Sequence, residues 1–391
     1  MATADAALLD APVSTPAAQL ASASSGAPKP LLVAVLDKSD ASVELAVLQR
    51  RLGGEARVRA VGLDVRSQAA AMGDPTLPFA DCVMVWHTVS VDAALLRRMP
   101  RARALVRVGV GYDNCDLRAC AEAGLPVVNV PAYGTEEVAD HAMSLVLGLF
   151  RRTLFSHAAA AGGEAAHGSD GVAALAKGTR RIRGCTLGIL GCGRIGTATA
   201  LRAKAFGFEV VFYDPHVPAG TDKALGIRRV GSPRALAEAS DCVSVHCDLN
   251  ATSRGLVDAA FMKAMRPGSF VVNTARGGIV DERALRLLLE SGHIAGAGID
   301  VHDVEPYVGT DPRVQPLANA PNCICTPHTA FFSEEAFVEM RTMAADSCCD
   351  ALLGLPLVNC VNARHLGEAA AAAAAAGRAL SIRAAVARPR E

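Results

Sequence analysis

The chain lacks any long block of charge of one sign. Its 39 lysine and arginine residues balance 39 aspartate and glutamate residues, and both kinds are interspersed along the sequence. A nucleic acid and an anionic membrane are both bound through concentrated positive charge. Neither is therefore an expected partner.

A membrane-length apolar run is also missing. The most apolar stretch, residues 142–150, is too short to span a bilayer. In and just before it, apolar residues recur at helical spacing, at Val138, Ala142, Leu145 and Leu149. This spacing predicts a helix with one buried face, not a membrane anchor.

The cysteines form no recognisable metal or disulfide framework. Twelve are scattered from Cys82 to Cys360, and no signal-peptide core precedes them. The closest pairs, such as Cys323 with Cys325, do not make the four-ligand set of a zinc site. We therefore expect reduced thiols, no metal site and a cytoplasmic location. The sequence leaves a nuclear location open.

Both ends of the chain are biased in composition. Residues 1–29 are rich in alanine, serine and proline, and residues 367–391 contain eight consecutive alanines followed by scattered arginines. We expect disordered tails there. A third biased segment, residues 156–171, is expected to form a surface loop, with extension of a helix as the alternative.

Short apolar runs alternate with helical patterns between the two tails. The runs indicate buried strands at residues 31–37, 80–86, 104–109, 125–130, 186–191, 209–214, 242–247, 269–274, 295–301 and 322–328. Strands that alternate with helices are typical of parallel sheets. The series begins afresh after Cys185, so the sequence predicts an α/β protein with two doubly wound parallel sheets.

A glycine-rich motif opens the second series of strands. Gly191, Gly193 and Gly196 form G-x-G-x-x-G directly after an apolar run and before an alanine-rich helical one. Such glycines permit a tight turn, close approach to a pyrophosphate and close helix–strand packing. Asp214 ends the next strand, where its carboxylate can accept hydrogen bonds from ribose and repel the 2′-phosphate of NADP. These features predict NAD (NADH) as the cofactor.

Further motifs resemble a known family. GCGRIG, NTARGG, IDVHDVEP and TPHTA occur in the order and near the spacings of the D-isomer-specific 2-hydroxyacid dehydrogenases. The stretches VRVGVGYDNCDLRAC, RGGIVDERAL and LVNCVNARHL are similar to one branch, the C-terminal binding proteins, which are transcriptional corepressors. The resemblance implies a Rossmann NAD domain at residues 132–324, inserted in a flavodoxin-like substrate domain at residues 30–131 and 325–366. It also implies catalysis in the cleft between them and a homodimer formed through the NAD domains.

Three residues suit the reduction of a 2-oxo acid. Arg276 stands between an alanine and the glycines 277 and 278, which leave room for substrate and dinucleotide, and its guanidinium can bind carboxylate and carbonyl oxygens together. His328 follows a strand, at the edge where open α/β sheets bind ligands. The resemblance makes His328, paired with Glu305, the general acid and base. A surface arginine in a turn and a structural histidine are the alternatives.

The resemblance also implies a set of binding residues. Those expected at the cofactor are Gly191, Cys192, Gly193, Arg194, Ile195, Gly196, Asp214, Cys247, Asn250, Thr252, Thr274, Ala275 and Asp300. Those expected at the substrate are Val110, Gly111, His87 and Arg276. Asp300 has a helix N-cap as its alternative, and His87 a packed strand-end histidine.

Two functions are compatible with these features. The first is an NAD-dependent oxidoreductase that interconverts a small 2-oxo acid and a D-2-hydroxy acid. The second is an NAD(H)-responsive dimeric scaffold, of the C-terminal binding protein type, that docks short peptide motifs of partner proteins. The chain departs from that branch near the histidine, where Phe331 and Phe332 replace a tryptophan, and at residues 53–64, where the branch holds peptides. The substrate is left unnamed.

Overall fold

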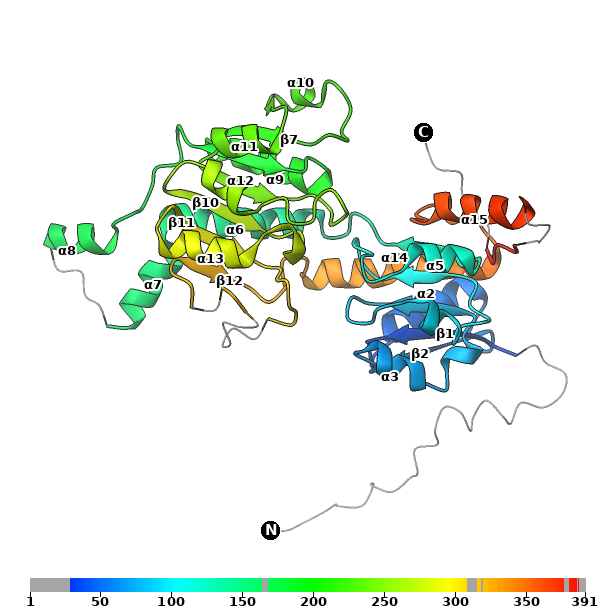
Figure 1. Cartoon of the computed structure of the whole chain (residues 1–391). Helices are drawn as coiled ribbons and strands as arrows, with labels where there is room; N and C mark the ends of the chain where they lie inside the picture. The colour runs from blue at the N-terminus through cyan, green and yellow to red at the C-terminus, as the bar shows by residue number, and fades with distance from the viewer. Residues whose placement is uncertain are drawn as a thin grey trace, which may run out of the picture. The chain divides into compact units, whose positions relative to one another are not determined.

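Two compact units make up the part of the chain that the structure describes. This computed structural model describes residues 29–163, 168–307, 315–317, 319–375, 380–384 and 386. One unit comprises Met1–Pro131 and Val338–Glu391, and the other Ala132–Phe337 (Figure 1). Each is built on one parallel sheet, so the predicted pair of α/β domains is confirmed. The tail expected at residues 1–29 lies outside the described residues, apart from Lys29.

The first unit holds a five-stranded sheet with the order β2-β1-β3-β4-β5, the flavodoxin-like arrangement. Its strands are β1 (Leu31–Leu36), β2 (Val58–Leu63), β3 (Cys82–Val85), β4 (Leu105–Arg107) and β5 (Val127–Asn129). Its shorter helices are α2 (Ser42–Leu52), α3 (Gln68–Gly73), η1 (Leu77–Phe79), α4 (Ala93–Leu96) and α5 (Leu117–Glu122). The four strands predicted in this unit are present, and the edge strand β2 is an addition.

The second unit holds a seven-stranded sheet with the order β12-β11-β10-β9-β6-β7-β8. Its strands are β6 (Thr186–Leu190), β7 (Glu209–Tyr213), β8 (Arg228–Arg229), β9 (Cys242–Val245), β10 (Ser269–Asn273), β11 (Ile294–Ile299) and β12 (Cys323–Cys325). The order reverses between β6 and β9, which is the crevice where doubly wound sheets bind dinucleotides. The six strands predicted after Cys185 are confirmed, and the short β8 is an addition.

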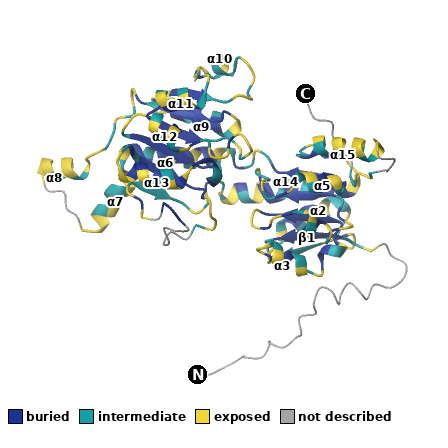
Figure 2. Ribbon diagram, viewed as in Figure 1, coloured by how far each residue is buried: buried dark blue, intermediate teal, exposed yellow. Residues whose placement is uncertain are grey.

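Helices cover both faces of this second sheet. Alternate strand residues point to opposite faces, and the two cores divide accordingly, since Val211 belongs to one and Phe212 to the other. One face packs on α6 (Thr135–Arg151) and α9 (Arg194–Ala205), and the other on α11 (Pro233–Ala239), α12 (Ala259–Ala264) and α13 (Glu282–Glu290). The short α10 (Thr221–Leu225) has no buried residue. Figure 2 shows the buried strands beneath helices with exposed outer faces.

The helix predicted from the apolar spacing around residues 138–149 is present as α6. All four residues of the expected face are buried, and Leu145 and Leu149 belong to the core on one face of the sheet. No helix among the described residues is long and apolar enough to cross a membrane.

The second boundary between the units differs from the predicted one. The sequence placed the return to the substrate domain at residue 325, whereas the structure places it at Val338, inside α14 (Glu334–Leu353). The reason is that β12 pairs with β11 in the NAD-domain sheet. The loop that follows β12 is hydrogen-bonded to Asp300, so it stays with the same unit.

The C-terminal segment is more ordered than predicted. Helix α15 (Ala363–Ala375) runs into the alanine stretch that was expected to be disordered, because alanine has the highest helix propensity. Further along, Arg383 donates hydrogen bonds to the carbonyls of Met99, Ala102 and Ala123. The biased segment at residues 156–171 includes parts of two helices, α7 (Thr153–Ala161) and α8 (Gly168–Leu175), neither of which has a buried residue.

Candidate active site

The glycine-rich loop joins the end of β6 to the start of α9. Gly191 has a φ of +92°, and a Cβ there would lie 2.6 Å from the backbone nitrogen of Cys247. A Cβ on Gly196 would lie 2.1 Å from the carbonyl oxygen of Gly191, so neither position has room for a side chain. Around Gly193, in contrast, nothing lies within 4 Å of the Cβ position. The loop is thus closed on its protein side and open where α9 begins, as pyrophosphate binding requires.

Asp214 follows the last residue of β7 and is held by backbone amides. Its carboxylate accepts hydrogen bonds from the amides of Cys192 at 2.8 Å, His216 at 2.8 Å and Val217 at 3.3 Å. The first of these hydrogen bonds joins Asp214 directly to the glycine-rich loop, so the two predicted cofactor elements are in contact. The Cys192 side chain is buried and its amide is engaged by Asp214, so direct contact of Cys192 with the cofactor stays a prediction.

Two further loops border this crevice. After β9, Asn250 Oδ1 accepts from the Thr252 amide at 2.8 Å and the Thr252 hydroxyl at 2.7 Å, which fixes a tight turn. After β10, the hydroxyl of Thr274 is buried and has no hydrogen-bond partner among the described residues. A buried polar atom of this kind generally needs a partner. Together with the open glycine loop and Asp214, it fits a bound dinucleotide.

Arg276 lies in the turn between β10 and the 3-10 helix η2 (Gly277–Ile279). Asn273 holds this turn: its Nδ2 donates to the Arg276 carbonyl at 2.9 Å, and its Oδ1 accepts from the Ala275 amide at 3.0 Å. Arg276 Nη1 donates to the Ala275 carbonyl at 2.7 Å. The guanidinium therefore extends from a backbone whose conformation is fixed by a buried amide side chain.

The two glycines after Arg276 differ in what surrounds them. A Cβ on Gly277 would lie 2.1 Å from the carbonyl carbon of His302 and 2.2 Å from its oxygen. On Gly278 the nearest atom would be the flexible end of Arg254, at 3.1 Å. The expectation that both glycines make room for ligands therefore needs correction, because Gly277 is required by the neighbouring backbone.

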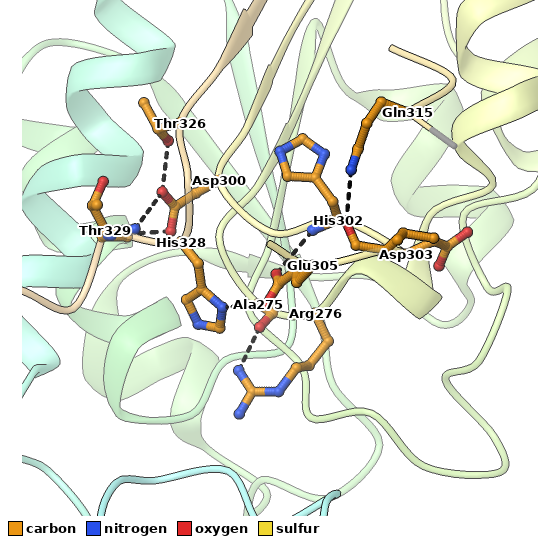
Figure 3. A network of polar contacts seen from close by, with 12 residues as sticks. Ala275, Arg276, Asp300, His302, Asp303, Glu305, Gln315, Thr326, His328 and Thr329 are labelled. Atoms are coloured by element: carbon orange, nitrogen blue, oxygen red, sulfur yellow. Dashed lines mark hydrogen bonds and ion pairs between the residues drawn. The ribbon is translucent and has the colours of Figure 1, made fainter. Parts of the chain in front are cut away.

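The Glu305 and His328 side chains meet at the carboxyl end of the same sheet. Glu305 Oε2 lies 2.7 Å from His328 Nδ1, and both side chains are partly exposed. Glu305 Oε1 accepts from the backbone amide of His302 at 3.1 Å. Figure 3 shows Arg276, Glu305 and His328 gathered in one region. All three belong to the second unit, whereas the sequence had assigned His328 to the substrate domain.

Asp300 anchors the loop that carries His328. It is fully buried at the end of β11, and its carboxylate accepts from the Thr326 hydroxyl at 2.6 Å, the Thr329 amide at 2.9 Å and the Ala330 amide at 3.0 Å (Figure 3). The backbone amide of His328 donates to the Asp300 carbonyl at 2.8 Å. His328 itself has a φ of +55°, a strained value for a side-chain-bearing residue. Direct contact of Asp300 with the cofactor stays a prediction.

Sequence reasoning missed a second, buried Glu–His pair behind this site. Glu282 Oε1 lies 3.2 Å from His302 Nδ1, and both side chains are almost completely buried. His302 is three residues before Glu305 in the motif IDVHDVEP. The position of His302 close to Glu305 could have marked it as a site residue. The sequence around His302 contains no indication that Glu282 is its partner.

The predicted substrate residues His87, Val110 and Gly111 lie in the first unit. His87 is exposed in the loop after β3, and Val110 is exposed in the loop after β4. Asn114 links the two loops, since its Nδ2 donates to the carbonyls of Trp86 and Val89, each at 2.8 Å. The structure therefore places these residues at adjacent strand ends, and their role in substrate binding stays a prediction.

The fold and the crevice define an NAD-binding protein of the α/β class. Residues 143–330 match the family described as D-isomer specific 2-hydroxyacid dehydrogenase, NAD binding domain. The chain belongs to the D-isomer-specific 2-hydroxyacid dehydrogenase family. Its second unit is the NAD-binding domain, and NAD is its cofactor.

The curated relatives include both a C-terminal-binding protein and a dehydrogenase. C-terminal-binding protein 1 of Caenorhabditis elegans is 37% identical over 335 residues, which are 85% of this chain and 45% of that protein. D-3-phosphoglycerate dehydrogenase of Mycobacterium leprae is 35% identical over 311 residues, which are 80% of this chain and 56% of that protein. The chain thus spans about half the length of these curated relatives.

A solved enzyme has the same fold over nearly its whole length. The crystal structure of D-lactate dehydrogenase from Aquifex aeolicus, complexed with NAD and lactic acid, superposes with a TM-score of 0.71 at 25% identity. The match covers 82% of this chain and 96% of that enzyme.

Proposed function

We propose that this chain is an NAD-dependent D-2-hydroxyacid dehydrogenase, which interconverts a 2-oxo acid and a D-2-hydroxy acid. The observation that carries the proposal is the 2.7 Å contact between Glu305 and His328, in the same strand-end region as Arg276. Family membership supports it, because relatives of this family include named dehydrogenases.

Proton transfer is the task proposed for His328. Glu305 contacts its Nδ1 and thereby orients the ring, and we assign the proton transfer to Nε2. In the reducing direction Nε2–H protonates the developing alkoxide, and in the oxidising direction Nε2 accepts the hydroxyl proton. When bound, NAD(H) would supply or take up the hydride at the substrate carbon, so that hydride and proton together account for the two hydrogens transferred.

Substrate binding is the task proposed for Arg276. A guanidinium forms two parallel hydrogen bonds with a planar carboxylate, which orients the 2-oxo acid. The same charge stabilises negative charge that develops on the carbonyl oxygen during reduction. The Asn273 contacts to the Arg276 turn support this role, because a catalytic side chain needs a backbone that does not move.

The test is turnover by matched arginine variants. Purified protein is assayed with NADH and NADPH against a panel of 2-oxo acids, and Arg276→Ala is compared with Arg283→Ala, an exposed arginine of α13. We expect Arg276→Ala to lose most turnover, by about 100-fold or more, because a transition-state charge contact is removed. NADH affinity is expected to stay near the wild-type value. Unchanged turnover of Arg276→Ala would reject the role of this residue, and no turnover of the wild type would reject the dehydrogenase.

A second candidate function is an NAD(H)-responsive scaffold that docks short peptides. The observation that favours it is the 37% identity to a C-terminal-binding protein. Residues 53–64, which depart from that branch, include the edge strand β2. Pull-down with short hydrophobic-acidic peptides, with and without NADH, distinguishes the candidates, and absence of binding in both states counts against the scaffold.

A further inference from the structure

A buried carboxylate lies between the two loops that carry the proposed catalytic groups. Glu282 is in the first turn of α13, six residues after Arg276 along the chain, and is 2% exposed. Its Oε1 accepts from His302 Nδ1 at 3.2 Å and from the Asp303 amide at 3.3 Å. One carboxylate oxygen therefore holds the segment that leads to Glu305.

The His302 side chain is clamped on two sides. Its ring stacks on Tyr307, with centroids 4.1 Å apart and planes 21° from parallel, and its Nδ1 faces Glu282. Burial lowers the pKa of His302, but the hydrogen bond and the negative charge of Glu282 outweigh burial, so the pKa is raised. The hydrogen bond between Glu282 and His302 is thus strengthened by the charge of Glu282. A shift of the His302 backbone would break this hydrogen bond.

The backbone of His302 in turn determines where Glu305 lies. Its amide donates to Glu305 Oε1 at 3.1 Å, while Glu305 Oε2 remains 2.7 Å from His328 Nδ1. On the other side, the His302 carbonyl touches Gly277, where even a Cβ would come within 2.2 Å of the oxygen. Contacts therefore run from Glu282 through His302 to Glu305 and His328, and also to the turn that holds Arg276.

We propose that Glu282 and His302 are positioning residues, which orient Glu305 towards His328 and keep the Glu305 loop in register with the Arg276 turn. The inference rests on the proposed dehydrogenase function. Neither residue reaches the substrate, since both side chains are buried. Their effect is on the geometry of the groups that do.

The experiment compares Glu282→Ala, Glu282→Gln and the control Glu290→Ala, which removes an exposed carboxylate of the same helix. Glu282→Ala is expected to lower kcat about 10- to 100-fold, because small misplacements of catalytic groups have effects of this size. NADH affinity is expected to change little. Glu282→Gln retains an oxygen acceptor for both donors and is expected to recover most of the lost kcat.

Two readouts separate positioning from simple stability. In Glu282→Ala the loss is expected to fall on kcat, with the KM for the 2-oxo acid nearly unchanged, because Arg276 is kept while the orientation of Glu305 towards His328 is lost. Hydrogen exchange in residues 302–305 is expected to become faster, which is measurable without turnover. A variant with lowered thermal stability but a wild-type kcat, or with unchanged exchange in this segment, overturns the inference. An inactive wild type with faster exchange in the variant instead rejects only the dehydrogenase.

Discussion

Replacing Gly277 by alanine is expected to reduce kcat about 100-fold while NADH binding stays nearly unchanged. The new Cβ would lie 2.1 Å from the His302 carbonyl carbon, whereas real Cβ contacts essentially never fall below 3.0 Å. The two backbones must therefore separate by at least 3.0 − 2.1 = 0.9 Å. One backbone belongs to the Arg276 turn and the other leads to Glu305. A displacement of about 1 Å between catalytic groups typically lowers rates by this factor, equivalent to about 2.7 kcal/mol in the activation barrier.

The matched control is Gly278→Ala, since the nearest atom to its Cβ is the movable end of Arg254, at 3.1 Å. Steady-state kinetics with the best substrate of the 2-oxo acid panel, NADH titration and thermal unfolding are measured for both variants. Overpacking at residue 277 is expected to lower the free energy of unfolding by about 1–3 kcal/mol. Equal kcat values for the two variants would refute the reasoning, and so would a wild-type kcat for Gly277→Ala.

Two further predictions concern the cofactor and a thiol. Asp214→Ser is expected to weaken NADH binding and shift the NADH-to-NADPH affinity ratio towards NADPH, because the repelling carboxylate is lost; fluorescence titration with an unchanged ratio would contradict this. The hydrogen bond from Cys323 lowers the pKa of the Cys325 thiol to about 7, and this outweighs burial. Because the thiolate is the reactive form, alkylation of Cys325 is expected to accelerate up to about pH 7 and level off above it. Peptide mapping that shows a rate still rising at pH 9 would count against the assignment.

The strands that sequence reasoning missed share a physical feature. Central strands of parallel sheets are buried on both faces and therefore read as continuous apolar runs. Strand β2 is an edge strand, exposed or half-buried after Val58, and contains Arg59, while β8 is only Arg228–Arg229. Neither makes an apolar run. The gaps in the predicted topology thus follow from the positions of these strands in their sheets.

The unit boundary was misplaced for a different reason. Residues 326–337 run into α14 without a change of composition that marks a boundary between the units. Their membership in the second unit depends on Asp300, whose carboxylate binds donors 26 to 30 residues away. Similarly, the alanine stretch was read as a tail, although its helix propensity is high and α15 starts in the preceding residues.

The proposed catalytic residues could be predicted from the sequence, whereas the positioning pair could not. Arg276, Glu305 and His328 were accessible because each follows a predicted strand, and parallel strands bring their carboxyl ends to one edge. Glu282 and His302 are separated by 20 residues and are each unremarkable in their local context. Their pairing exists only because β10 and β11 are neighbours, so that the turn after one strand packs against the backbone after the other. The same packing explains why residue 277 must be a glycine, whereas the sequence analysis had attributed this glycine to the space that ligands need. Reactive groups of the site can therefore be predicted from their positions just after predicted strands. The contacts that fix their geometry cannot, because they depend on which strands are neighbours in the sheet.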